Sequence, residues 1–329
     1  MSRPKVPDSL REFLDAGEDF VVCSHMEPDG DCVASSLALG SFLKRRGCTV
    51  THLNPGPFNR TEIIRFAPEF LPRLPEDRAT TGLRAIVVDC STVERIGDIA
   101  DDVASLPTAV IDHHSAGEVF GEQRYVDVTA PATCFLIQNI IESYGESPTR
   151  EEAELLLFGL ATDTGFFRHL DKDSADVFGS VSRLVAAGAV PRTIHALMYG
   201  DRPMNARRLL ARLIDRVESH CDGAVMITWE SLADAEEFGR ATRDSDTLYQ
   251  LLTSVEGVRA VAVVREETRS SCTGSLRSVD DTDVGEVARQ FGGGGHKRAA
   301  GFLTHGSLAE TKKAVARALS DAVCSTKSK

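Results

Sequence analysis

Histidine and aspartate residues follow the first apolar run of the sequence. The run DFVVCSH leads into MEPDGD, which places His25, Asp29 and Asp31 in the spacing H-x-x-x-D-x-D. In an extended or turning segment, residues two apart point the same way, and a histidine at the strand end can close on them. An imidazole together with carboxylates favours a divalent transition metal such as Mn, Fe, Co or Zn. A single Asp-Gly-Asp after a strand is more commonly a solvated turn, so this segment alone does not establish a metal site.

Polar groups of the same kind recur further along the chain. Asp89 follows AIVV, and Asp112, His113 and His114 follow TAVI. We group Asp163 with these strand-end residues, although it follows LLLFGLAT, the end of a helix-like segment. The recurrence makes a metal site a better explanation than separate surface turns.

Four of these carboxylates would repel one another if they converge, because like charges at short range are costly in a protein. They are Asp29, Asp31, Asp89 and Asp163. Two divalent ions would cancel the four charges, and such a pair can activate water and clamp a phosphoryl oxygen for in-line attack. The predicted reaction is therefore hydrolysis of a phosphoester.

Strands alternate with helices in the first half of the chain. The apolar runs DFVVCSH, LRAIVVD and PTAVID each precede a polar cluster, and helical stretches such as CVASSLALGSFLKRRG separate them. This alternation predicts an α/β fold with a doubly wound, mainly parallel sheet, in which ligands bind beyond the carboxyl ends of the strands. The polar clusters would then share one edge.

The pattern changes at VPRTIHALMYGDRPMN, which holds two prolines and a Gly-Asp turn signal. We expect a first domain over residues 1–189, a linker over 190–205, and a smaller α+β domain over 206–329. The second domain contains the strand-like runs GAVMITW and VRAVAVVRE, a glycine run and a closing helix.

The composition of the 329 residues, 42% hydrophobic and 26% charged, is typical of a soluble protein. No run approaches the ~20 apolar residues of a membrane helix, and the first residues lack the apolar segment of a secretory signal. We therefore expect a cytoplasmic protein without a membrane partner. The eight cysteines form no C-x-x-C pair, so we expect reduced thiols.

The net charge of -12 arises in the first 205 residues, which hold 19 Lys and Arg against 31 Asp and Glu, whereas residues 206–329 hold 18 of each. A protein that binds a long nucleic-acid duplex normally carries a basic stripe, and none is visible. An anionic substrate is thus expected to be short or to be met by bound cations.

The motifs together resemble a known family, the DHH phosphoesterases. HMEPDGD, VVDCS, AVIDHHS and ATDTGFF are similar to four of its motifs in the expected order, and GSLRS (274–278) and GGGGHKRAAG (292–301) resemble its DHH-associated domain. The sequence departs from many relatives at Ala34 and Thr92, neither of which is a predicted ligand. The resemblance is to the bacterial bifunctional oligoribonucleases that also dephosphorylate 3'-phosphoadenosine 5'-phosphate.

The resemblance implies two manganese ions that share Asp89 as a bridging ligand. The implied ligands are His25, Asp29 and Asp89 for one ion and Asp31, Asp89, His113 and Asp163 for the other. His114 is implied to contact the substrate phosphate or the leaving group, and Asp112 to orient the neighbouring imidazoles.

The glycine run at 292–295 has a physical interpretation of its own. Successive glycines allow backbone N-H groups to approach a phosphate, with further donors on the next three side chains, although a flexible loop would look the same. No Gly-Lys-Ser/Thr ending of a Walker A loop is present. The resemblance implies a nucleotide-recognition surface that faces the metals across an interdomain cleft, and its predicted residues are Ser275, Arg277, Gly294, Gly295, His296 and Arg298.

The expected function is hydrolysis of short oligoribonucleotides to mononucleotides and removal of the 3'-phosphate of 3'-phosphoadenosine 5'-phosphate. The nearest alternative is a phosphodiesterase for linear or cyclic dinucleotide second messengers; a pyrophosphatase and a RecJ-type exonuclease are less favoured. A catalytically silent nucleotide-binding regulator would lack one or more ligands, and all of them are present. The resemblance is also compatible with a homodimer.

Overall fold

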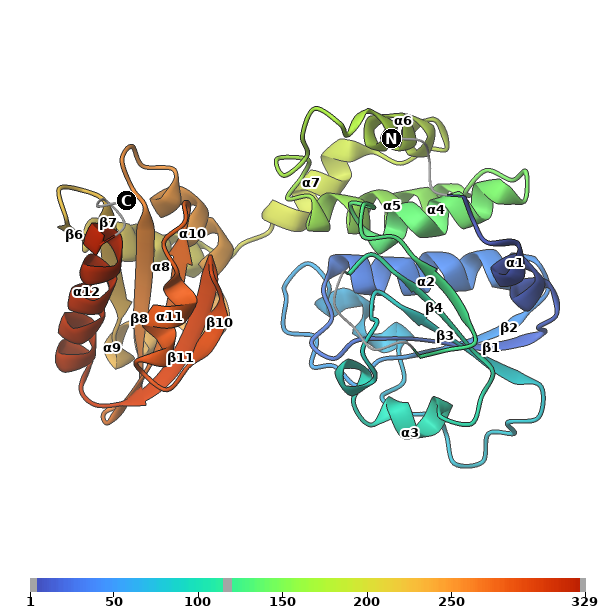
Figure 1. The fold of residues 1–329 in the computed structure, drawn as a ribbon, viewed down its shortest axis with the longest axis horizontal. Coiled ribbons are helices and arrows are strands. Elements are labelled where there is room, and N and C mark those ends of the chain that lie inside the picture. Colours follow the sequence, from blue (N-terminus) through green and yellow to red (C-terminus); the bar gives the residue numbers. More distant parts are fainter. Residues whose placement is uncertain (1–4, 115–119, 326–329) are drawn as a thin grey trace. The chain divides into compact units, whose positions relative to one another are not determined.

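The computed structural model describes residues 5–114 and 120–325, and the chain divides into two compact units (Figure 1). The first unit is Met1–Asp201 and the second is Arg202–Lys329. Helix α7 (Pro191–Tyr199) lies inside the segment for which we predicted a linker, and α8 (Met204–Asp215) begins the second unit.

The described part of the first unit contains one sheet of five strands, all parallel, in the order β2-β1-β3-β4-β5. Their bounds are β1 (Asp19–Ser24), β2 (Thr49–Leu53), β3 (Leu83–Val88), β4 (Thr108–Asp112) and β5 (Gln123–Val126). The predicted α/β class is thereby confirmed, with a first sheet that is entirely parallel.

The three central strands are continuous apolar runs because both of their faces are covered. On β1, Phe20 and Val22 pack on one side, whereas Val21 and Cys23 pack on the other. Figure 1 shows α2, α4 and α5 on one face and α3 on the opposite face. The helices are α1 (Asp8–Asp15), α2 (Gly30–Arg45), α3 (Ile99–Val103), α4 (Thr133–Ser143), α5 (Arg150–Asp163) and α6 (Ala175–Ala186), with short 3₁₀ turns at Ile64–Glu69 and Val93–Ile96.

The strand order places a topological switch point between β1 and β3. The chain leaves β1 towards β2 on one side and later returns to β3 on the other, which opens a crevice at the carboxyl ends of these two strands. His25 follows the last residue of β1, and Asp89 follows the last residue of β3. The fold therefore directs two of the predicted ligands into this crevice.

The described part of the second unit contains a mixed sheet of six strands in the order β10-β11-β9-β8-β7-β6, in which only β7 and β8 are parallel. One face packs against α11 and α12, and the other packs against α8 and α10. The remaining bounds are β6 (Glu218–His220), β7 (Val225–Glu230), α9 (Leu232–Phe238), a 3₁₀ turn (Arg240–Thr242), α10 (Ser245–Thr253), β8 (Ala260–Thr268), β9 (Ser271–Ser278), α11 (Val284–Arg289), β10 (Gly294–His296), β11 (Ala299–His305) and α12 (Leu308–Ser325).

None of the helices within residues 5–114 and 120–325 has both the length and the apolar character that a bilayer crossing requires.

Candidate active site

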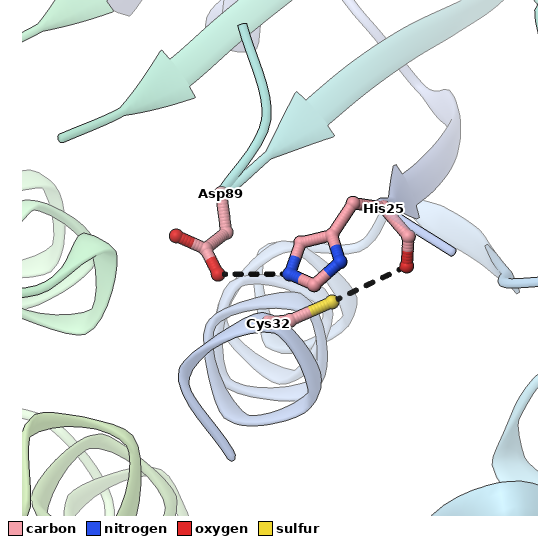
Figure 2. Close-up of side chains that lie close together, drawn as sticks. All are labelled: His25, Cys32 and Asp89. Atoms are coloured by element: carbon pink, nitrogen blue, oxygen red, sulfur yellow. Dashed lines mark hydrogen bonds and ion pairs between the residues drawn. The ribbon is translucent and has the colours of Figure 1, made fainter. Parts of the chain in front are cut away.

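His25 and Asp89 meet at the switch point of the first sheet. Figure 2 shows their side chains pointing towards one another from the ends of β1 and β3, and His25 Nε2 lies 3.6 Å from Asp89 Oδ2. The other ring nitrogen, Nδ1, lies 2.7 Å from the carbonyl oxygen of Met26, which fixes it as the N-H donor. Burial lowers the pKa of His25, so its imidazole is neutral with Nε2 available to a metal ion.

Asp89 is held by its backbone as well as by its side chain. Its φ of 57° is left-handed, a conformation uncommon outside glycine but one that aspartate tolerates better than most residues. The Thr133 hydroxyl donates to Oδ1 at 2.9 Å. The carboxylate is almost completely buried, and its position is therefore set before any ligand arrives.

Asp31 lies beneath the first turn of α4 and is completely buried. Its two oxygens accept hydrogen bonds from the backbone N-H groups of Thr133, at 2.5 Å, and Cys134, at 2.9 Å. These N-H groups have no partner within the helix, and the helix dipole favours a negative charge at this end. Asp31 thus anchors α4 to the beginning of α2.

His113 joins Asp31, Asp89 and Asp163 into one cluster. Its Nε2 lies 3.1 Å from Asp163 Oδ2 and 3.6 Å from Asp89 Oδ1, while Nδ1 is 3.2 Å from the carbonyl oxygen of Ala130. Asp163 is the last residue of α5. We had grouped it with strand ends; it reaches the cluster instead from a helix that packs across α2 and α4.

His114 and Asp112 form a pair at the side of this cluster, where His114 Nδ1 also lies 3.8 Å from Asp89 Oδ1. Asp112 Oδ1 accepts from His114 Nδ1 at 2.8 Å and from both histidine backbone N-H groups, and Ser91 donates to Oδ2. Burial alone would raise the pKa of Asp112, but the hydrogen bonds from His114 and Ser91 outweigh it and hold the pKa below its ordinary value. The His114 side chain is 40% exposed, so its Nε2 edge can reach a substrate.

The structure gives Asp29 a role that the sequence pattern did not indicate. Its Oδ1 caps α2 by accepting from the backbone N-H of Cys32 at 3.1 Å. Among the described residues, possible metal ligands form groups in which the ligand atoms lie within 4.8 Å of one another. Together these groups contain the other five predicted ligands, but none of them contains Asp29. The charge of Asp29 still acts on His25 and Asp89.

Three positioning residues escaped the sequence analysis. Thr133 contacts both Asp31 and Asp89, Ser91 contacts Asp112, and Asn54 donates to the carbonyl of His25 at 2.9 Å. Asn54 follows the last residue of β2, so the strand-end rule could have found it. Cys32 also approaches His25 and Asp89, with its thiol 3.8 Å from the His25 carbonyl (Figure 2).

The cluster needs a positive charge. Burial, followed by the charge of Asp163, raises the pKa of Asp31 to about 7, and burial with the charge of Asp31 raises the pKa of Asp89. Burial would lower the pKa of His113, but the carboxylates of Asp163 and Asp31 raise it to about 9. A set of carboxylates and imidazoles in which protons are held this tightly fits divalent ions of the Mn or Zn type.

A cavity of about 380 Å³ opens beside Asp163. Its apolar wall includes Phe135, Leu170 and Val177, and its polar wall includes Asp173 and Thr129. The cavity therefore offers both an apolar surface and hydrogen-bond acceptors next to the carboxylate cluster.

Four of the six predicted substrate residues of the second unit, Ser275, Arg277, Gly294 and His296, share one face of its sheet. Across the paired strands β9, β11 and β10, Ser275 is opposite Gly301, which is opposite Gly294; in the next row Arg277 is opposite Ala299, which is opposite His296. Directly opposed residues point to the same face. These two rows, which we call the glycine face, combine one arginine and one histidine with residues that have little or no side chain.

The second half of the glycine run, Gly294 and Gly295, belongs to the edge strand β10, and Gly295, opposite Ala300, points to the other face. A Cβ on Gly294 would meet nothing within 4 Å, so packing does not require a glycine there, whereas at Gly295 φ is 141° and a Cβ would lie 2.6 Å from the Ala299 carbonyl oxygen. Arg277 lies over the Tyr249 ring at 4.8 Å. Arg298 lies in the turn after β10, outside the two rows, and the neighbouring Lys297 pairs with Asp281 at 2.9 Å.

Two family models match the chain, one within each of its two units. The DHH family, N-terminal domain, matches residues 19–160, and the DHHA1 domain matches residues 222–324. The bifunctional oligoribonuclease and PAP phosphatase NrnA of Thermus thermophilus is 28% identical over 300 residues, which cover 90% of this chain and 88% of that protein.

A second relative, the cyclic-di-AMP phosphodiesterase PdeA of Listeria monocytogenes, is 25% identical over 95% of this chain and 49% of its own length. The crystal structure of an exopolyphosphatase-related protein from Bacteroides fragilis superposes with a TM-score of 0.83 at 24% identity and covers 95% of both chains. With both domain models matched in order over the two units, the chain belongs to the DHH phosphoesterase family and carries a C-terminal DHHA1 domain.

Proposed function

We propose that this protein hydrolyses short oligoribonucleotides to mononucleotides and removes the 3'-phosphate of 3'-phosphoadenosine 5'-phosphate. The observation that carries the proposal is a set of neighbouring groups of possible metal ligands in the first unit. Asp89 and His113 each belong to two of these groups, which is the arrangement that two neighbouring cations sharing ligands would require. The relationship to NrnA supports the choice of substrates.

His25 and Asp89 would hold one divalent ion together with Asp29, whose Oδ1 caps α2 and whose Oδ2 would be the ligand atom. Asp31, Asp89, His113 and Asp163 would hold the other ion. Mn²⁺ suits this mixture of imidazoles and carboxylates. When bound, the two ions would lower the pKa of a water molecule and neutralise charge on the phosphoryl group. The hydrogen bonds from Thr133 and Cys134 to Asp31 fix the direction of that ligand.

We assign His114 to the leaving group. Its Nδ1-H is held by Asp112, so Nε2 is the nitrogen that faces outwards. When the ring is protonated on both nitrogens, with Nδ1-H donated to Asp112, it can donate the Nε2 proton to the leaving oxygen as the phosphoester bond breaks. The exposure of His114 leaves room for the substrate at this atom.

The cavity beside Asp163 would accept the nucleoside next to the reacting phosphate. A base can pack against Phe135, Leu170 and Val177, and ribose hydroxyls can donate to carboxylates such as Asp173. On the second unit, the glycine face would bind a further phosphate or base, with Arg277 as a bidentate donor. Recognition of so few nucleotides is consistent with short substrates and with the acidic first unit.

The proposal can be tested by a hydrolysis time course on the metal-stripped protein, with and without added Mn²⁺. The substrates are 3'-phosphoadenosine 5'-phosphate, an RNA dinucleotide, a 24-nucleotide RNA and pyrophosphate. The blank is Asp89→Asn, and its matched control is Asp101→Asn, which changes an exposed carboxylate on α3. Mn²⁺-dependent turnover of the first two substrates with little cleavage of the long RNA is expected; turnover of pyrophosphate alone, or of long RNA alone, would overturn the substrate assignment.

A second candidate function is hydrolysis of cyclic or linear dinucleotide second messengers, which the relationship to PdeA favours. Both functions need the same carboxylate cluster and differ in base recognition. Cyclic di-AMP and its linear product pApA are therefore added as parallel substrates. A kcat/KM for cyclic di-AMP above that for 3'-phosphoadenosine 5'-phosphate would make this the better assignment.

A further inference from the structure

We propose that Cys221 and Cys324, in the second unit, are a redox pair that forms a reversible intramolecular disulfide. The two residues are 103 positions apart, and their Sγ atoms lie 3.1 Å from one another. Because a disulfide bond is about 2.05 Å long, the sulfur atoms must approach by only about 1 Å. Sequence spacing gave no sign of this pair, and we had expected reduced thiols throughout.

The backbone holds both thiols in place. Cys221 lies in the turn between β6 and β7 with a left-handed φ of 52°, and Cys324 lies in the last turn of α12. The Cys221 thiol also lies 3.8 Å from the carbonyl oxygen of Ser320, one turn earlier on the same helix. The Cys221 side chain therefore rests along the end of α12.

The end of α12 is itself anchored. Arg259 Nη1 donates to the carbonyl of Val323 at 2.9 Å, and Val315, Leu319 and Val323 are completely buried against the sheet. The sulfur atoms thus face one another from two packed elements, and bond formation requires side-chain rotation more than backbone movement. Such preorganisation favours a bond within the chain over a bond between chains.

Access also distinguishes this pair from five of the other six cysteines. Those five are buried, whereas Cys324 is exposed and Cys221, like Cys48 of the first unit, is partly exposed. Burial raises the pKa of Cys23, so its reactive thiolate form is suppressed. An oxidant in solution therefore reaches Cys324 first, and Cys221 is the neighbour that completes the bond.

The chemistry is a two-electron oxidation. The two thiols lose two electrons and two protons and form one S-S bond, while a low-molecular-weight disulfide is reduced to two thiols or an azo compound such as diamide is reduced to a hydrazine. Excess dithiol reverses the reaction. The bond would tie the end of α12 to the β6–β7 turn and close a loop of about a hundred residues, which restricts the unfolded chain.

The test treats the full-length protein with diamide, alkylates the remaining thiols and maps the peptides by mass spectrometry. The expected product is a monomer lighter by two hydrogen atoms before alkylation, with the peptide of Cys221 linked to that of Cys324. Alkylation of both cysteines after treatment, a link from either to another cysteine, or a covalent dimer through Cys324 would overturn the proposal.

A melting experiment tests the effect on stability. The oxidised protein should melt about 5 °C or more above the reduced protein. Cys221→Ser and Cys324→Ser should each abolish this difference, whereas the matched control Cys48→Ser, at a partly buried cysteine of the first unit, should retain it. An equal melting temperature of the linked and reduced forms would contradict the stabilising role.

Discussion

The two regions that we assign to the substrate are built in opposite ways. In the first unit, carboxylates and imidazoles converge at the ends of buried parallel strands. They are fixed by hydrogen bonds from the Thr133 and Ser91 hydroxyls and from the backbone N-H groups of Thr133 and Cys134. In the second unit, the glycine face is an antiparallel surface with few large side chains, one arginine and one histidine. It is exposed along β10 and half-buried along β9 and β11. The first region needs bound cations, whereas the second offers its own positive charge to an anion.

This difference predicts that variants in the two regions fail in different ways. Changes at the carboxylate cluster should lower metal occupancy and turnover, and changes on the glycine face should raise KM and leave the metal content unaltered. A cluster variant with a raised KM and full metal content, or a glycine-face variant with a reduced metal content, would contradict this difference.

The largest effect is expected from Asp89→Asn, which removes a shared ligand and retains the shape and left-handed backbone of the residue. Loss of an outer hydrogen-bond partner of a metal ligand typically lowers activity about 10–100-fold, so loss of Asp89 should exceed about 100-fold. Metal content by atomic emission and steady-state kinetics check this, with Asp101→Asn as the control. Full metal content together with near-normal turnover in Asp89→Asn would exclude Asp89 as a metal ligand.

Asp112→Asn should lower kcat roughly 10–100-fold while the metal content stays unchanged. The amide can still accept from His114, but it lacks the negative charge that faces this ring in the native protein. The test measures kcat on a substrate with a good leaving group, such as p-nitrophenyl phosphate, beside a poor one. If His114 protonates the leaving oxygen, the good leaving group should lose much less; an equal loss on both would contradict this role.

On the glycine face, Arg277→Ala should raise KM for 3'-phosphoadenosine 5'-phosphate about tenfold, because a charge-assisted hydrogen bond contributes about 1.5 kcal/mol. Arg277→Lys should recover only part of the loss, since lysine cannot bind an anion with two parallel donors. The control is Arg269→Ala, at an exposed arginine in the turn between β8 and β9. An unchanged KM in Arg277→Ala would exclude this arginine from substrate binding.

A smaller effect is expected in the cavity beside Asp163. Leu170→Trp fills part of this space and should raise KM for nucleotide substrates a few-fold, without changing KM for p-nitrophenyl phosphate, which has no nucleoside. Leu251→Trp, at an exposed leucine of the second unit, provides the control for the added indole. A similar rise in KM for both kinds of substrate would indicate a general disturbance of the cluster.

The smallest effect is expected in the pH dependence of the free energy of unfolding of the metal-free protein. Folding raises the pKa of Asp31 from 3.8 to about 7 and that of His113 from 6.5 to about 9. Both groups bind more protons in the folded than in the unfolded chain, so each lowers the free energy of unfolding as pH rises through its range. Between about pH 4 and 6.5 this is opposed by His52 and His25, because burial lowers the pKa of both imidazoles. The free energy of unfolding should therefore fall between about pH 6.5 and 9. Carboxyls with a lowered pKa, such as Asp234, titrate below this window.

Denaturant titrations in EDTA across this pH range check the slope, and Mn²⁺ should stabilise the protein most at its upper end. Asp31→Asn should remove the part of the pH dependence that Asp31 contributes, up to about pH 7. Stability of the metal-free protein that rises between about pH 6.5 and 9 would contradict the charge cluster.

The sequence predicted the parts of this molecule that follow from local pattern. Apolar runs followed by His25, Asp89 and Asp112 located the strand ends, and the parallel-sheet rule placed them on one edge. The contacts of Asp31 with α4 were not predictable, because they join residues about a hundred positions apart and depend on how the helices pack. The same limit concealed the route by which Asp163 enters the cluster from the end of α5.

The glycine face illustrates a different limit. A run of four glycines looks like a flexible loop in the sequence, and only the pairing of Gly294 and Gly295 with β11 makes its second half part of a strand. Arg298 lies outside the rows because the turn after β10 interrupts the alternation. Register, which the sequence does not reveal, decides which members of a motif share a face.

The left-handed backbone of Asp89 has a consequence for how this protein can evolve. The conformation suits glycine best, and the buried carboxylate is repelled by its neighbours, so position 89 is occupied by a residue that weakens the metal-free fold. Selection for thermal stability alone would favour an uncharged residue at position 89. Such a residue would stabilise the fold and remove the catalytic activity. The persistence of aspartate there would thus mark a lineage in which turnover, rather than robustness, is under selection.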